Sequence, residues 1–393
     1  MTNLPYVPTE YSVKPSLKKL EYDPHFIIDE WYPDYRNEKM AARHENLEKY
    51  YMEIPSKTRL QSQRLPTHNA LMKTITFWMA ETLAKQYRKI SFRPQEELYV
   101  FHNDYSNESV WVDEELNVVQ ILKSPNHEHS KKRGEKYPKP AYKNLFDAIC
   151  SQIQEDVCIM RNDELVANHV CLPSWWSPEE KMGKSMAEIH ADIPGMEKTA
   201  YDHIWNASLY KGPYLRYNWA LTDTPILNQH PSKNIGKNFD RDSLFLRLER
   251  QVLQGFPEVC AVLFLIRTYV GDIKTMDKKH RVTLGEVVNN IPVTDYICGD
   301  PMDEKAQIKV AAIAILEKFK VSVKDKDFIK YLDTSINTYL GEPLSILKSG
   351  KKLVDDDASS IIQGVADGLN PFTGEAFDFK VDDIQSKLER LIN

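Results

Sequence analysis

Strand-like segments in the middle of the chain restrict the fold more than any other feature. Residues 261–270 read AVLFLIRTYV, and the unbroken apolar run from Ala261 to Ile266 is typical of a strand buried on both faces. Arg267 follows at once, and a buried guanidinium without a partner is very unfavourable. We therefore expect a sheet in which Arg267 meets a carboxylate, either that of Glu249 or that of a ligand.

Two further segments have the same mixture of apolar and charged positions. They are LRYNWAL from Leu215 and FLRLERQVL from Phe245. Side chains alternate between the two faces of a strand, so each segment predicts one apolar and one polar face. The residues on the polar faces are Arg216, Asn218, Arg247, Glu249 and Gln251. This face lines either solvent, with a few salt bridges, or a polar cavity.

Residues 164–195 predict a strand followed by a capped helix. Pro173 ends the strand, because proline cannot donate to a sheet ladder. Ser177 is an expected N-cap, with Pro178 at the first helical position and Glu180 completing a capping box, and the helix should run to about His190. A histidine at such a helix end is either a structural residue or a ligand, since neutral imidazole commonly binds metals.

Taken together, these segments resemble the haem-binding alpha subunit of the haem-dependent oxidative N-demethylase family. Over roughly residues 154–271 they keep the family's order, and the ordered set is specific although no single piece is. The pieces are Gln154-Glu155-Asp156, Pro173-Ser174-x-Trp176 with Lys181 and Gly183, Ile189-His190, Arg216-x-Asn218-Trp219, Arg247-x-Glu249-Arg250-Gln251 and Ile266-Arg267-Thr268-Tyr269.

The resemblance implies an α+β fold, with a PAS-like antiparallel sheet core and flanking helices, that binds haem b. The activity it implies is oxygen-dependent removal of a methyl group from a small secondary amine as formaldehyde. The chain has no dinucleotide fingerprint, no P-loop and no four-cysteine iron–sulfur set. Electrons would therefore come from a separate reductase partner, and the resemblance implies that this partner uses NADPH, flavin and iron–sulfur components.

The resemblance also assigns roles to residues. His190 would be the axial ligand of the haem iron, with His169 or His203 as the next candidates. Arginine forks match carboxylates, so the propionates would be held by one of the strand arginines. The expected haem-binding residues are His190, Arg216, Asn218 and Arg247, and Arg267 is a further possible clamp. The expected catalytic residues, as suppliers of charge and protons, are Glu249, Arg267 and Tyr269.

Other interpretations remain open at this point. A cysteine thiolate, from Cys171 or Cys260, is a rival haem ligand, although buried cysteines are more often structural. The loop sequence at residues 127–129 (His-Glu-His) lacks a third converging ligand, so we do not expect a metal there. A haem-binding gas or redox sensor without turnover, and an interaction protein that has lost the cofactor, are the alternative functions.

The chain is expected to divide into an extended N-terminal arm (1–65), a haem-binding domain (66–280) and a helical C-terminal region (281–393). Within the middle part, amphipathic helices are predicted at 67–89 and 141–154. A formal net charge of −6 with 27% charged residues argues against a nucleic-acid partner. No apolar run has the length of a membrane span and the N-terminus lacks a signal-peptide core, so we expect a cytoplasmic protein.

Overall fold

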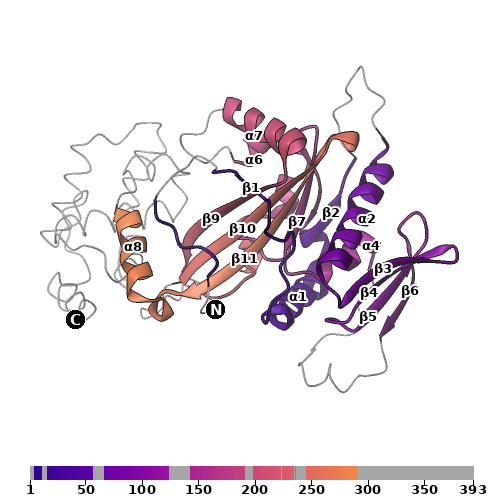
Figure 1. The fold of residues 1–393 in the computed structure, drawn as a ribbon, viewed down its shortest axis with the longest axis horizontal. Helices are drawn as coiled ribbons and strands as arrows, with labels where there is room; N and C mark the ends of the chain where they lie inside the picture. Colours follow the sequence, from indigo (N-terminus) through magenta and orange to yellow (C-terminus); the bar gives the residue numbers. More distant parts are fainter. Residues whose placement is uncertain are drawn as a thin grey trace, which may run out of the picture.

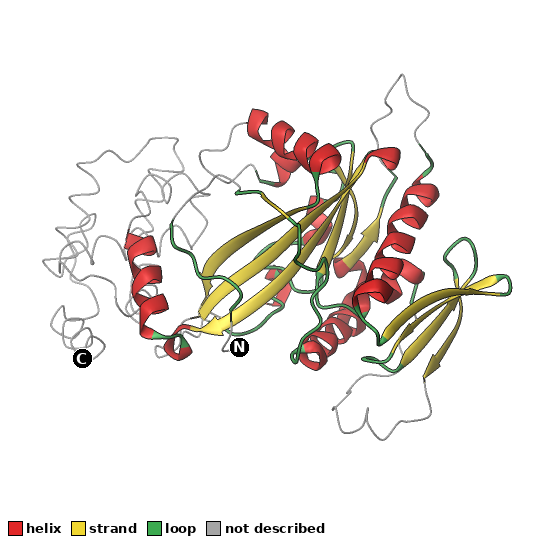
Figure 2. Ribbon diagram, in the orientation of Figure 1, coloured by secondary structure: helices red, strands yellow, loops and turns green. Residues whose placement is uncertain are grey.

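In the computed structural model of the chain, the described residues are 4–10, 16–55, 66–123, 142–190, 198–222, 224–233, 235 and 245–289. They form two antiparallel sheets with several helices, which confirms the expected α+β class (Figures 1 and 2). The helices expected within 290–393 and the 127–129 loop lie outside the described residues. No described helix is long and apolar enough to cross a membrane.

The larger sheet has seven strands in the order β1-β9-β10-β11-β7-β8-β2, and all neighbours are antiparallel. Their bounds are β1 (Lys18–Lys19), β2 (Tyr51–Glu53), β7 (Asp156–Arg161), β8 (Glu164–His169), β9 (Tyr214–Thr222), β10 (Phe245–Phe256) and β11 (Ala261–Asp272). The three segments predicted as strands are β9, β10 and β11, which confirms that interpretation. The β10–β11 hairpin pairs along its whole length and forms the middle of the sheet.

The register confirms the predicted alternation of side chains. Gln251 lies opposite Arg216 on β9 and Ile266 on β11, so these side chains share one face with Glu249. Arg250 lies opposite Arg267, and Tyr269 follows on the same side. We call these the glutamate face (Arg216, Glu249 and Gln251) and the arginine face (Arg250, Arg267 and Tyr269).

Three helices cover the glutamate face: α5 (Pro178–Lys181), α6 (Met186–Ile189) and α7 (Lys198–Lys211). Helices α6 and α7 are labelled in Figure 1. Helix α7 packs on β10 and β11. Gly255 of β10 makes this possible, because a Cβ there would collide with the carbonyl oxygens of Ser208 and Leu209. The glycine therefore sets how closely α7 approaches the sheet.

The single helix predicted from Ser177 to His190 is wrong, since α5 and α6 are separate short helices. Ser177 makes no side-chain cap, and the capping box is formed instead by Ser185 and Glu188. The chain breaks at Gly183, which has φ 74° and donates its N–H to the carbonyl of Leu165 at 2.8 Å. His190 consequently ends a helix of one turn.

Helices α1 (Tyr32–Tyr50), α2 (His68–Gln86) and α4 (Leu145–Ser151) lie on the other side of the sheet (Figure 2). Helix α2 confirms the helix predicted at 67–89, and it is capped by Thr67, whose side chain accepts from the N–H of Ala70. Helix α1 occupies part of the segment expected to be an extended arm. It is held by buried polar side chains rather than by an apolar stripe, which explains why the sequence pattern did not indicate it: Lys39 donates to the Cys150 carbonyl at 2.9 Å.

A second sheet of four strands lies beyond α2 (Figure 1). Its strands, in order, are β3 (Ile90–Gln95), β4 (Leu98–Asn103), β5 (Glu108–Val112) and β6 (Val118–Lys123). Short 3-10 helices span Pro231–Lys233, Pro257–Val259 and Ile273–Thr275. The last described helix, α8 (Lys278–Asn289), begins a few residues before the expected C-terminal region at 281, and Asp277 accepts from the N–H of His280 at 2.9 Å in its first turn.

Candidate functional site

His190 lies at the C-terminal end of α6, above the glutamate face of the sheet. Its backbone N–H and its ring Nδ1 both contact the carbonyl of Met186, at 3.2 and 2.8 Å. A carbonyl only accepts, so Nδ1 carries the proton and Nε2 is the nitrogen that can bind a metal. Burial lowers the pKa of His190, while the Met186 carbonyl acts in the opposite direction. The ring is therefore neutral at physiological pH, as a ligand must be.

Tyr201 of α7 fixes the plane of this imidazole. The two rings stack with centroids 5.7 Å apart and an interplanar angle of 13°. The Tyr201 hydroxyl also donates to the backbone carbonyl of His190 at 3.3 Å. Since Tyr201 is only 5% exposed, its buried ring restricts the orientation of the His190 imidazole on one side.

Arg216 projects from β9 on the same face, and it is half-buried. Its Nε is buried without a hydrogen-bond partner, and the guanidinium forms no ion pair with another residue of the described chain. Burial lowers the pKa of Arg216, and the field of Glu249 opposes that shift. A desolvated guanidinium that lacks a protein acceptor is suited to bind a ligand carboxylate.

Glu249 stands between these cations in the middle of the sheet. It is half-buried on β10, and the amide Nε2 of Gln251 donates to its Oε2 at 2.8 Å. Its negative field raises the pKa values of His190, Arg216 and Arg247, against the larger lowering effect of burial in each case. Asn218, exposed on β9, lies opposite it in the register. The carboxylate of Glu249 thus lies among several basic groups.

Apolar side chains surround this polar group and separate the sheet from α6 and α7. They come from the sheet and from the covering helices, and several are aromatic or sulfur-containing. The buried members include Cys158, Met160, Met186, Tyr201, Ile204 and Ile266, and the partly buried ones include Trp176, Met182, Trp205 and Phe264. A histidine and an arginine without an ion-pair partner, beside these apolar side chains, are residue types that could hold haem through its iron and a propionate.

Arg247 lies on the glutamate face but is used mainly by the protein. It is 1% exposed, and its two terminal nitrogens donate to the carbonyls of Leu227 at 3.0 Å and Leu172 at 2.7 Å. Only its Nε is left without a partner. Arg247 therefore ties two loops to the sheet, and it offers less to a ligand than Arg216 does.

Arg267 and Tyr269 point away from Glu249, because they lie on the arginine face. The carboxylate that Arg267 meets is that of Asp29, at 3.0 Å, so the expected pairing with Glu249 is wrong. Its guanidinium also lies between the rings of Tyr35, at 3.7 Å, and Tyr269, at 4.5 Å. The three expected catalytic residues are thus divided between the two faces, with Glu249 alone beside His190.

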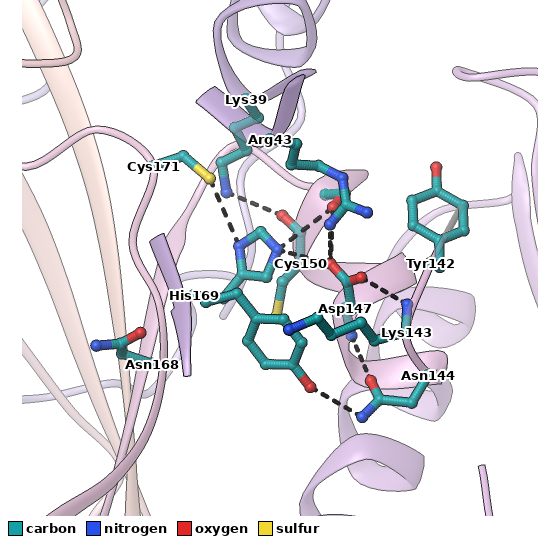
Figure 3. Close-up of polar contacts among 12 residues, drawn as sticks. Lys39, Arg43, Tyr142, Lys143, Asn144, Asp147, Cys150, Asn168, His169 and Cys171 are labelled. Atoms are coloured by element: carbon teal, nitrogen blue, oxygen red, sulfur yellow. Dashed lines mark hydrogen bonds and ion pairs between the residues drawn. The ribbon is translucent and has the colours of Figure 1, made fainter. Parts of the chain in front are cut away.

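Two of the alternative haem ligands, His169 and Cys171, contact each other, and His169 also contacts Asp147 (Figure 3). His169, on the arginine face, is fully buried, with Nε2 3.0 Å from Asp147 and Nδ1 3.7 Å from the sulfur of Cys171. Burial raises the pKa of the Cys171 thiol to about 12, which disfavours a thiolate. Cys260 lies in the β10–β11 connection with φ 53°, and His203 is exposed on α7. His190 is the candidate that shares a face with Arg216 and Glu249.

A comparison with known protein families shows to which family this chain belongs. Over residues 16–295 the chain matches the family described as haem-dependent oxidative N-demethylase, alpha subunit-like. The chain belongs to this family. Membership in the haem-dependent oxidative N-demethylase family indicates an oxidoreductase that depends on haem. The matched stretch includes every element from β1 to α8, so the family fold covers both sheets.

Some residues of the site could not be assigned from the sequence. Gln251 was visible on the polar face of its strand, two positions from Glu249, but nothing distinguished it as the partner of that carboxylate. Tyr201 carries no signal that would place it against His190. Asp29 is 238 residues away from Arg267 in the chain, so no local pattern links them.

Proposed function

We propose that this chain is a haem b enzyme that removes a methyl group from a small secondary amine as formaldehyde, using oxygen and electrons from a separate reductase. The observation that carries the proposal is that His190 and Arg216 lie on the glutamate face, beside the apolar side chains that α6 and α7 contribute. His190 offers Nε2 while its Nδ1 is bonded to a carbonyl, and Arg216 lacks a protein acceptor among the described residues. Family membership supports the same conclusion.

We also propose that the core is PAS-like. Its five central strands run in the order β9-β10-β11-β7-β8, and the three covering helices lie in the connection between β8 and β9. The N-terminal part belongs to the same unit, because β1 and β2 hydrogen-bond to β9 and β8. We therefore extend the proposed haem-binding unit from 66–280 to about 16–289.

The chain's own residues would hold the haem as follows. His190 binds the iron through Nε2, with the Met186 carbonyl orienting the ring. Arg216 binds a propionate, Asn218 lies at the same edge of the sheet, and the Nε of Arg247 is a further donor. Bound haem supplies the activation of oxygen and the oxidation of the methyl carbon.

Glu249 is the residue that we assign to the substrate. A half-buried carboxylate attracts a protonated amine and can then accept its proton, so that the neutral amine is presented for oxidation. The apolar side chains from α6 and α7 limit the access of water to this carboxylate. Arg267 and Tyr269, on the other face, stabilise the sheet rather than touch the substrate.

An absorption spectrum of the purified chain tests the proposal. Wild type should show a Soret band that shifts when a secondary amine is added, and His190→Ala should lose the band while remaining folded. His203→Ala, an exposed histidine of α7, is the matched control and should keep it. A normal Soret band in His190→Ala would overturn the ligand assignment.

The rival function is a haem-based gas or redox sensor. It predicts the same Soret band but no formaldehyde when NADPH, a reductase system and a secondary amine are supplied. Formaldehyde production that requires oxygen therefore separates the enzyme from the sensor. If the purified protein shows no Soret band, both the enzyme function and the sensor function are excluded.

A further inference from the structure

Gln251 is a buried polar residue whose presence the fold does not explain. It lies in the middle of β10 and is 6% exposed. Within the described chain, its side chain makes a single hydrogen bond, the 2.8 Å bond from Nε2 to Glu249, and its Oε1 is buried without a partner. A buried amide with an unpaired oxygen costs stability compared with an apolar side chain of the same size.

The neighbours of Gln251 restrict what its amide can do. Arg216 and Ile266 lie opposite it on β9 and β11, and neither offers an acceptor for Nε2. The bond to Oε2 therefore fixes one oxygen of Glu249 and leaves Oε1 as the oxygen that can accept from a ligand. A donor to a charged oxygen makes a stronger bond than a neutral pair does, so the carboxylate is held in one orientation.

We propose that Gln251 is a positioning residue for Glu249, and that it orients the carboxylate for a protonated secondary amine. This inference rests on the proposed function. It adds a residue that acts through Glu249 and does not itself touch the haem. Because Oε1 of Gln251 is buried without a partner, the amide lowers the stability of the fold compared with an apolar residue at this position.

The experiment compares Gln251→Met with wild type in the haem-loaded full chain, using dimethylamine, the simplest secondary amine, as the probe. Amine affinity, measured by the spectral shift, should fall about tenfold, because a hydrogen bond to a charged group is lost. The Soret band should be unchanged and the melting temperature should stay level or rise. Gln254→Met, on the same strand but the opposite face, is the matched control and should keep wild-type affinity.

A double-mutant cycle shows whether Gln251 acts through Glu249. In a Glu249→Gln background, Gln251→Met should change amine affinity by less than about twofold. An equal tenfold loss in both backgrounds, a lower melting temperature, or an unchanged affinity in the single variant would overturn the proposal. A wild-type protein whose spectrum does not respond to the amine would instead contradict the proposed function, so the two failures are distinguishable.

Discussion

The two faces of the seven-stranded sheet use the same kind of residue in opposite ways. On the arginine face, Arg267 is fully buried and is surrounded by the Asp29 carboxylate and two tyrosine rings. On the glutamate face, Arg216 is half-buried and has no ion-pair partner among the described residues. Both arginines come from apolar strands, so strand pattern alone does not distinguish a structural cation from a binding one.

The difference lies in what covers each face. The segments on the side of α1, α2 and α4 bring polar groups to the arginine face: Asp29 pairs with Arg267, and Asp147 of α4 lies 3.0 Å from Nε2 of His169. Helices α6 and α7 bring mostly apolar side chains and one histidine to the glutamate face. A cation that pairs with a carboxylate of the protein supports the fold, whereas a cation without such a partner among the described residues is available to a ligand.

The largest difference between the faces should appear when each arginine is replaced by methionine. Arg267→Met should lower the free energy of unfolding by about 3 to 5 kcal/mol, because Asp29 loses its buried partner. Arg216→Met should change it by less than about 1 kcal/mol. Urea unfolding of haem-free samples measures both. Equal losses in the two variants would remove the distinction between the faces.

Acid should destabilise the protein through the arginine face. Burial lowers the pKa of His169 from 6.5 to about 4, so the folded state holds it neutral where the unfolded state is protonated. Its contribution is complete above pH 6.5 and is lost as the pH falls towards 4, by about 3 kcal/mol in total. Urea unfolding across this range tests the prediction, and His169→Gln should flatten the dependence.

A charge change on the glutamate face should affect turnover rather than folding. Glu249→Gln should reduce the turnover of a secondary amine by about a hundredfold, as expected for loss of an acid–base group, while the melting temperature and the Soret band stay close to those of wild type. Glu258→Gln, an exposed residue of the β10–β11 connection, is the control. Normal turnover in Glu249→Gln would make that residue structural.

The smallest expected effect concerns the covering of the glutamate face. Gly255→Ala should destabilise the protein by about 1 to 3 kcal/mol, because the new methyl group collides with the carbonyls of Ser208 and Leu209. The displacement of α7 should also disturb Tyr201 and so weaken haem retention. Thermal unfolding and haem transfer to apomyoglobin measure the two effects. A fully wild-type Gly255→Ala would mean that α7 does not depend on this close approach.

Much of this fold could be predicted from the sequence because it is local in origin. The strands β9, β10 and β11 follow from apolar runs and alternation, and α2 follows from its apolar stripe. Helix α1 could not be predicted in this way, since its buried positions include Arg36 and Lys39. The break at Gly183 depends on a bond to a neighbouring strand, which no local pattern indicates.

The sequence indicated which residues of three strands share a polar face, but it did not indicate which other residues contact them. Alternation placed Arg216, Glu249 and Gln251 on one kind of face, and the register confirms that they lie together. The partner of Arg267 could not be predicted, because Asp29 comes from a distant segment packed on the opposite face. Residue type and the alternation of side chains along a strand therefore identify candidate binding residues. The elements that cover each face decide which candidates pair within the protein and which remain available to a ligand.

The ends of the large sheet have a consequence for how the protein behaves at high concentration. Strand β1 has two residues, both exposed lysines, and β2 has three. Short or lysine-bearing border strands offer few unpaired backbone groups to another molecule and repel a second copy of themselves. The long apolar strands β10 and β11 remain in the interior, where they cannot recruit strands from other copies. The order of the strands thus keeps the two longest apolar strands of the large sheet away from its borders.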